Sequence, residues 1–158
     1  GTHPTTVMCL QALEKTVKPN LSVVDVGTGS GVLSIGAAKL GAATVHALDL
    51  DEVAVRSAQE NIAINRVSDI VKVTHGNLLD NITEQADIVV ANILAEIIMT
   101  FTDDAYTIVK SGGLFITSGI ISTKKDDVKT ALQNSGFEID EIMMMEDWVT
   151  IISRKPVK

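Results

Sequence analysis

The sequence predicts an α/β domain built on one open, mostly parallel sheet. Short β-branched or apolar runs alternate with helical stretches along most of the chain, and the last two β-rich runs are separated only by an acidic pair. A helix between two successive strands can serve as the crossover connection that parallel strands need. The connection between the last two strands is too short for a crossover and fits a β-hairpin. We therefore expect one antiparallel strand near an edge of the sheet.

The individual elements follow from periodicity and from helix-ending residues. A first helix is expected over residues 5–17, where apolar side chains recur at helical spacing until Pro19. Asp51 is expected to cap a later helix, and Gly112 and Gly113 to close another. The sequence predicts strands at 21–26, 43–50, 70–77, 86–94, 113–120, 137–147 and 148–155, and further helices at 31–42, 52–66, 95–110 and 123–136.

Composition limits the classes of function. A chain of 158 residues, 46% hydrophobic and 21% charged, fits one globular domain. A formal net charge of −7 argues against a broad phosphate-binding surface, and 3% aromatic residues leave few rings for stacking bases. Direct nucleic-acid binding is therefore not expected.

The sequence also bears on compartment and on metals. No apolar run approaches the roughly 18 residues of a membrane span, and no signal peptide is evident at the start. A lone Cys9 fits a reducing compartment, so we expect a cytoplasmic protein without membrane contact. His3, His46 and His75 show no metal-ligand spacing with one another or with Cys9, so no metal site is expected.

The stretch "DVGTGSGVLSIG", residues 25–36, places Gly27, Gly29 and Gly31 directly after the first predicted strand. In open α/β sheets ligands bind beyond the carboxyl ends of the strands, and glycine allows a ligand to approach the backbone. The dinucleotide fingerprint requires a glycine where this sequence has Val32. The turn alone leaves open a dinucleotide, another nucleoside ligand, or a tight βα turn without a ligand.

Two polar residues at strand ends bear on which ligand the glycine turn binds. Asp49 ends the second predicted strand, where a carboxylate can accept both hydroxyls of a ribose and would repel a 2′-phosphate. Asn77 ends the third predicted strand and could meet an adenine edge, although a plain turn residue explains it equally well.

Several segments together carry a family resemblance. The segments "GTHPTT", "DVGTGSGVLSIGAAKLGA", "ALDLDEVAVRSAQENIAIN", "ANILAEII", "GGLFITSGII" and "EDWVTIISRK" occur in this order. Over nearly the whole chain the sequence resembles the bacterial ribosomal protein L11 methyltransferase family. This resemblance implies the Rossmann-like, seven-stranded class I methyltransferase fold and S-adenosylmethionine as cofactor. It also implies methyl transfer to lysine ε-amines and the N-terminal α-amine of large-subunit ribosomal protein L11.

Matched position by position, the resemblance places cofactor contacts on Thr6, Gly27, Asp49 and Asn92. Asn92 is also the candidate catalytic residue, since its amide oxygen can accept hydrogens of the amine and orient the lone pair. Two of these residues have simpler interpretations: Asn92 could cap the next helix, and Thr6 could be an N-cap. Asp25, just before the glycine turn, could pair with the cofactor's ammonium group or be a polar strand end.

The family carries a separate N-terminal domain that recognises the substrate. Because the sequence begins at "GTHPTT", residues 1–158 are expected to be the catalytic domain alone, either as part of a longer protein or as a shorter relative. Enzymes that methylate adenine place Pro-Pro and an aromatic residue after the asparagine, whereas Ile93, Leu94 and Ala95 follow Asn92 here. This favours a protein amine as acceptor. The alternatives are methylation of another protein, a small molecule or a nucleic acid, a nicotinamide-dependent oxidoreductase domain, and a non-catalytic cofactor-binding module.

Overall fold

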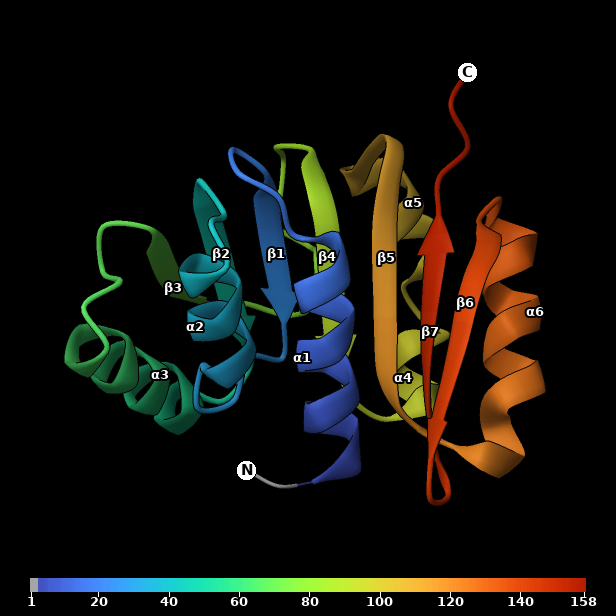
Figure 1. Ribbon diagram of the computed structural model, residues 1–158, viewed down its shortest axis with the longest axis horizontal. Helices are drawn as coiled ribbons and strands as arrows, with labels where there is room; N and C mark the ends of the chain where they lie inside the picture. Colours follow the sequence, from blue (N-terminus) through green and yellow to red (C-terminus); the bar gives the residue numbers. More distant parts are fainter. Residues whose placement is uncertain (1–2) are drawn as a thin grey trace.

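A seven-stranded sheet in the order β3-β2-β1-β4-β5-β7-β6 forms the centre of the protein (Figure 1). The computed structural model describes residues 3–158. The strands are β1 (Ser22–Val26), β2 (Thr44–Asp49), β3 (Val71–His75), β4 (Ala86–Asn92), β5 (Val109–Ile121), β6 (Glu138–Met145) and β7 (Trp148–Arg154). β1 to β5 pair in parallel, and β7 pairs antiparallel with both β5 and β6. The mostly parallel sheet with a C-terminal antiparallel hairpin is confirmed.

Helices cover the sheet on both faces, and each face has its own apolar cluster. One cluster joins the sheet to α1 (Pro4–Thr16), α2 (Val32–Lys39) and α3 (Glu52–Ile64). The other joins it to α4 (Ala95–Ile98), α5 (Thr102–Ile108) and α6 (Lys125–Ser135), which follows the short 3₁₀ turn η1 (Ser122–Lys124). No helix within residues 3–158 is both long and apolar enough to cross a membrane.

The single helix predicted over 95–110 was wrong. The structure has two short helices, α4 and α5, separated at Phe101, whose side chain is 1% exposed and packs edge-to-face on Phe115 of β5 (ring centroids 5.8 Å apart). The Thr100 hydroxyl donates to the carbonyl of Ile97, a hydrogen bond at the C-terminal end of α4. Burial of one aromatic ring thus overrides the helical periodicity of the sequence.

The glycine pair expected to close that helix instead lies inside β5. The backbone N–H of Gly112 donates to the carbonyl of Lys155 (2.7 Å), and the N–H of Lys155 donates to the carbonyl of Gly113 (2.9 Å). A Cβ atom at Gly113 would lie 2.6 Å from the carbonyl oxygen of Asp87, so only glycine permits this approach to β4. β5 begins four residues earlier than expected, and the bounds of the other expected elements are shifted by at most three residues.

Candidate functional site

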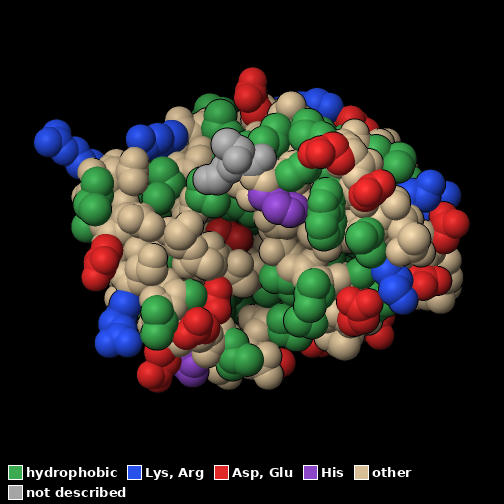
Figure 2. Space-filling model, turned by 90° about the horizontal axis from the view of Figure 1, so that it is seen from below, with side chains coloured by type: hydrophobic (Ala, Val, Ile, Leu, Met, Phe, Trp, Pro, Cys, Tyr) green, Lys and Arg blue, Asp and Glu red, His purple; other side chains and the backbone are tan. Residues whose placement is uncertain are grey.

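The residues that the sequence singled out gather along the carboxyl edge of the parallel strands. Figure 2 views this edge from below Figure 1; the centre of the face is hollowed, with hydrophobic and acidic side chains around it. The glycine turn follows β1, Asp49 ends β2, Asn92 ends β4, and the start of α1 lies beside β5. Parallel strands place their carboxyl ends together, so residues far apart in sequence become neighbours here.

The three glycines of the turn all have positive φ, but they face different surroundings. Gly27 (φ +72°) packs on Ile93, and Gly31 (φ +88°) packs on Ala58 of α3, where a Cβ atom would lie 3.3 Å from the Ala58 Cβ. A Cβ atom at Gly29 (φ +57°) would meet nothing within 4 Å. Packing therefore accounts for two of the glycines, while Gly29 presents bare backbone to open space that a ligand can fill.

Asp49 is joined to this turn by hydrogen bonds. Its Oδ2 accepts the N–H of Gly29 (2.9 Å) and its Oδ1 accepts the N–H of Asp51 (2.9 Å). A carboxylate offers about four lone-pair sites, so each oxygen can still accept a hydroxyl. The arrangement holds a carboxylate beside the exposed backbone of Gly29 and suits a ribose diol. Asp51 accepts the N–H of Val53 (2.9 Å), which confirms it as the N-cap of α3.

Asp25 lies beneath the turn rather than at the surface, with 1% of its area exposed. Its Oδ2 accepts the hydroxyls of Thr28 and Ser34, each at 2.8 Å, which ties β1 to the turn and to α2. Its Oδ1 is buried and has no hydrogen-bond partner within the described part of the chain. Burial raises the pKa of Asp25 above its ordinary value; the bonds from Ser34 and Thr28 oppose this rise, and the negative charge of Asp49 adds to it.

Replacing Asp25 by Asn tests this burial through the pH dependence of stability. The raised folded-state pKa means that the neutral acid is favoured in the fold, so stability is full below the unfolded pKa and falls as the pH rises through the folded value. Asn does not titrate. The free energy of unfolding of Asp25→Asn, relative to the wild type, is expected to increase as the pH rises above about 4. Urea unfolding of both proteins from acid to neutral pH measures it, and a difference independent of pH would contradict it.

Asn92 is half-buried at the end of β4 and lies opposite Ser118 in the register with β5. The next helix, α4, begins with Leu94 as its N-cap and has no side-chain cap bond. The alternative interpretation of Asn92 as a helix cap was therefore wrong. The side chain stands at the edge of the sheet next to the strand that carries the glycine turn.

Thr6 lies in the first turn of α1 and is half-buried. The N-cap is His3, whose Nδ1 accepts the N–H of Thr5 (3.2 Å), so the interpretation of Thr6 as the cap was wrong. The Ser118 hydroxyl donates to the carbonyl of Thr5 (3.4 Å), and the His3 ring packs edge-to-face on Trp148 (5.0 Å). These contacts hold the start of α1 against β5 and β7, on the Asn92 side of the edge.

Asn77 lies two residues beyond the end of β3 and is exposed. Its carbonyl accepts the N–H of Asp80 (3.1 Å), which makes it part of a turn. The preceding Gly76 donates its N–H to the carbonyl of Asp49 (3.0 Å), so Asn77 stands close to the Asp49 end of the site. The geometry allows both interpretations that the sequence left open.

Sequence reasoning missed four residues that organise this edge: Thr28 and Ser34, which hold Asp25, and Ile93 and Gly119, which pack together behind Asn92. For Gly119 the sequence contained a signal of this role. Gly119 interrupts an apolar strand pattern, and an isolated glycine in a strand indicates a bulge or a close backbone approach.

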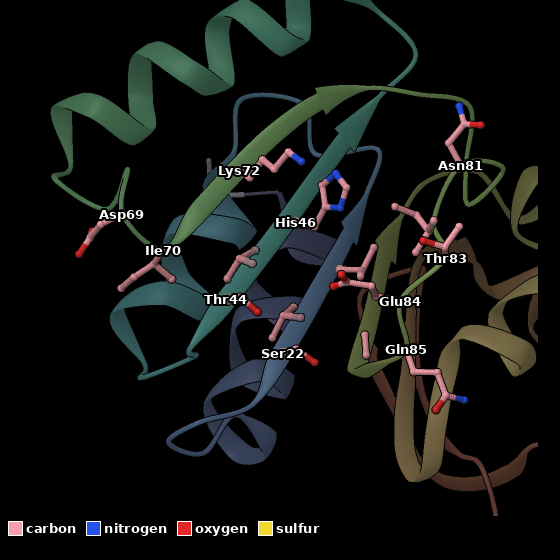
Figure 3. Close-up of a pocket in the computed structure, with 15 residues that line it drawn as sticks. Ser22, Thr44, His46, Asp69, Ile70, Lys72, Asn81, Thr83, Glu84 and Gln85 are labelled. Carbon is pink, nitrogen blue, oxygen red and sulfur yellow. The ribbon is translucent and has the colours of Figure 1, made fainter.

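A second hollow, of about 500 Å³, lies on the sheet face away from α2 and α3, over the amino-terminal halves of β1 and β2 (Figure 3). It is present because the connection from β3 to β4 contains no helix. None of the predicted site residues lines it. Burial and the nearby Lys72 lower the pKa of His46, and Asp69 and Glu84 add negative charge, so this hollow is poorly suited to an anion.

The carboxyl edge, in contrast, fits a nucleoside-type cofactor. Three features support the fit of a nucleoside-type cofactor: the open space at Gly29, the Asp49 carboxylate beside it, and the buried Oδ1 of Asp25, which has no hydrogen-bond partner in the described residues. Nowhere in residues 3–158 do three His, Cys, Asp or Glu side chains gather in a way that could hold a metal ion.

The family model described as "Ribosomal protein L11 methyltransferase (PrmA)" matches residues 1–156. The chain belongs to this family. It is 64% identical over 155 residues to the ribosomal protein L11 methyltransferase of Anoxybacillus flavithermus, covering 98% of this chain and 50% of that protein. The match to the protein of Geobacillus kaustophilus is also 64%, over 156 residues, 99% of this chain and 50% of that protein. The chain thus spans about half the length of the curated relatives it matches.

Solved structures agree with the family. The ribosomal protein L11 methylase of Lactobacillus delbrueckii subsp. bulgaricus superposes with a TM-score of 0.94 at 35% identity, covering 99% of this chain and 81% of that chain. A methyltransferase of Pyrococcus furiosus superposes with a TM-score of 0.84 at 17% identity, covering 99% of this chain and 88% of that one, and shows the shared fold alone. The expected class I methyltransferase fold is therefore confirmed.

Proposed function

We propose that residues 1–158 form the S-adenosylmethionine-binding catalytic domain of a protein amine methyltransferase. The proposed acceptors are lysine ε-amines and the N-terminal α-amine of ribosomal protein L11, the protein named in the relatives' descriptions. The observation that carries the proposal is the pairing of Gly29 and Asp49: bare backbone faces open space, and a carboxylate bonded to that backbone stands beside it.

Each proposed cofactor contact has a separate task. Asp49 would accept the ribose hydroxyls, the turn at Gly27, Gly29 and Gly31 would admit the ligand against its backbone, and Asn77 is proposed to contact the adenine edge. Thr6, in the first turn of α1, is proposed to contact the cofactor through its hydroxyl group. Asp25, buried under the turn, supports Thr28 and Ser34 and acts on the cofactor's ammonium through the turn or a water molecule.

Asn92 is proposed to hold the acceptor amine. When bound, S-adenosylmethionine supplies a methyl group on a sulfonium, and transfer forms the N–C bond as the C–S bond breaks and its electron pair passes to sulfur. The Asn92 amide oxygen accepts an N–H of the amine and so aims the nitrogen lone pair at the methyl carbon. A lysine amine with a reference pKa of about 10.4 must first lose a proton, which a desolvated site favours and which water can accept.

Calorimetric titration tests cofactor binding. The chain is expected to bind S-adenosylhomocysteine saturably and not to bind NAD, because its turn departs from the dinucleotide fingerprint at Val32. Binding of NAD alone would contradict the proposal, as would binding of neither compound.

Methyl transfer to L11 is tested with the full-length protein, isotopically labelled S-adenosylmethionine and purified L11, followed by peptide mass spectrometry. Label is expected on lysine side chains and on the N-terminus. The matched control is L11 with all amines acetylated, which should take up no label. Equal labelling of the acetylated protein, or no labelling of the native protein, would contradict the proposed acceptor.

A further inference from the structure

Ile93 lies between Gly27, in the turn that follows β1, and Gly119, in β5. A Cβ atom at Gly27 would lie 2.7 Å from the Cγ2 methyl of Ile93. A Cβ atom at Gly119 would lie 2.5 Å from the carbonyl oxygen of Ile93 and 3.0 Å from its backbone nitrogen. Contacts this short leave no room for a side chain at either glycine. The side chain of Ile93 therefore packs against Gly27 of the glycine turn, and its backbone packs against Gly119 of β5.

The peptide side of this contact is also hydrogen-bonded. The N–H of Ile93 donates to the carbonyl of Ser118 (3.1 Å), directly after the register pair of Asn92 and Ser118. Gly119 has φ +81° and lies where the register of β5 with β7 shifts. This bulge lets β5 approach the segment that carries Asn92.

We propose that Ile93 is a positioning residue for methyl transfer. Its Cγ2 methyl, packed on Gly27, sets the spacing between the glycine turn and the Asn92 amide. This inference rests on the proposed function, in which the turn holds the methyl donor and Asn92 holds the amine. The residue itself touches neither reactant in this account and acts through the two segments that it separates.

The chemistry of the side chain explains why isoleucine suits this task. A β-branched side chain has a strongly restricted χ1, so its Cγ2 methyl holds a fixed position relative to the backbone. Leucine has the same number of carbon atoms but carries no methyl group on Cβ. Because in-line transfer depends on the distance and direction between donor and acceptor, a displacement of about 1 Å can cost about 100-fold in rate.

Three variants isolate the Cγ2 contact. Ile93→Leu removes that methyl, and Ile93→Val keeps it while losing the terminal methyl. Ile98→Leu makes the same chemical change at a fully buried position of α4, and no atom of Ile98 lies within 4 Å of a Cβ atom built on Gly27 or Gly29. The readouts are kcat and KM for amine methylation and the affinity for S-adenosylhomocysteine.

In Ile93→Leu, kcat is expected to fall by about tenfold or more, with cofactor affinity within about threefold of the wild type. Ile93→Val should retain kcat within about twofold, and Ile98→Leu should lose stability while keeping kcat. Equal kcat values in Ile93→Leu and Ile98→Leu would overturn the inference. An equal loss in Ile93→Val would also overturn it, because the methyl on Gly27 is retained there.

Hydrogen exchange gives a readout that does not depend on turnover. S-adenosylhomocysteine is expected to slow exchange of the Ile93 amide, which donates to Ser118, in the wild type and in Ile93→Val but much less in Ile93→Leu. Equal slowing in all three proteins would overturn the inference and leave the proposed function intact. Failure of the wild type to bind S-adenosylhomocysteine would overturn the proposed function and this inference with it.

Discussion

Asn92→Ala is expected to lower kcat for amine methylation by about 100-fold or more. The substitution removes the amide oxygen that is proposed to orient the amine, while the backbone of β4 and its pairing with Ser118 remain available. Since alanine leaves the acceptor free to rotate, the loss should appear mainly in kcat and less in the affinity for S-adenosylhomocysteine.

Steady-state kinetics of the full-length protein with L11 as acceptor measures this effect. The matched control is Asn134→Ala, which removes an exposed amide from α6, far in the fold from the carboxyl edge. That variant should keep the parent kcat. A parent-like kcat in Asn92→Ala would show that the amine is positioned by other groups and would remove Asn92 from its proposed catalytic role.

Asp49→Ala is expected to weaken S-adenosylhomocysteine binding by about 100-fold. Two hydrogen bonds from the ribose to a charged group contribute about 1.5 kcal/mol each at the low end, and about 1.4 kcal/mol corresponds to a tenfold change in affinity. The same carboxylate accepts the N–H of Gly29, so the variant also loosens the turn. Calorimetric titration reports the affinity directly.

The neighbouring Asp51 supplies the control for this experiment. Asp51→Ala removes the N-cap of α3 and should cost about 1 kcal/mol of stability, but it leaves Asp49 and the turn in place. Its affinity for S-adenosylhomocysteine is expected to stay close to that of the wild type. If both variants lost affinity equally, the role of Asp49 would be structural and the proposed ribose contact would be wrong.

Much of the fold could be predicted because periodicity and glycine positions are local properties. The alternation of strands and helices predicted the parallel sheet, and the two β-rich runs after residue 136 predicted the hairpin. The helix predicted over 95–110 failed because its pattern was locally helical while Phe101 was drawn into a core formed with Phe115. A contact between residues far apart in the sequence cannot be recognised from the local spacing of apolar residues.

The candidate site was predicted in part for the same reason. Asp49 was identified from its place near the end of an apolar strand, and Asn92 from the family resemblance. The structure places both at the carboxyl ends of parallel strands, which lie at a common edge. The burial of Asp25 could not be predicted, since its partners Thr28 and Ser34 meet it only after the turn has folded over it. The sequence showed Ile93 only as one of the residues that replace Pro-Pro and an aromatic residue after Asn92, and its contacts with Gly27 and Gly119 appear only in the structure.

By itself the sequence determined the fold class, the position of the glycine turn and the strand ends that carry polar groups, because each depends on residue type and spacing along the chain. Only the tertiary structure decided what each glycine does: Gly27 accommodates Ile93, Gly31 accommodates Ala58, and Gly29 faces open space. All three occupy the same kind of position in the sequence and share a positive φ. What distinguishes them is the neighbour that packing brings from a distant part of the chain, and spacing within the turn carries no information about that neighbour.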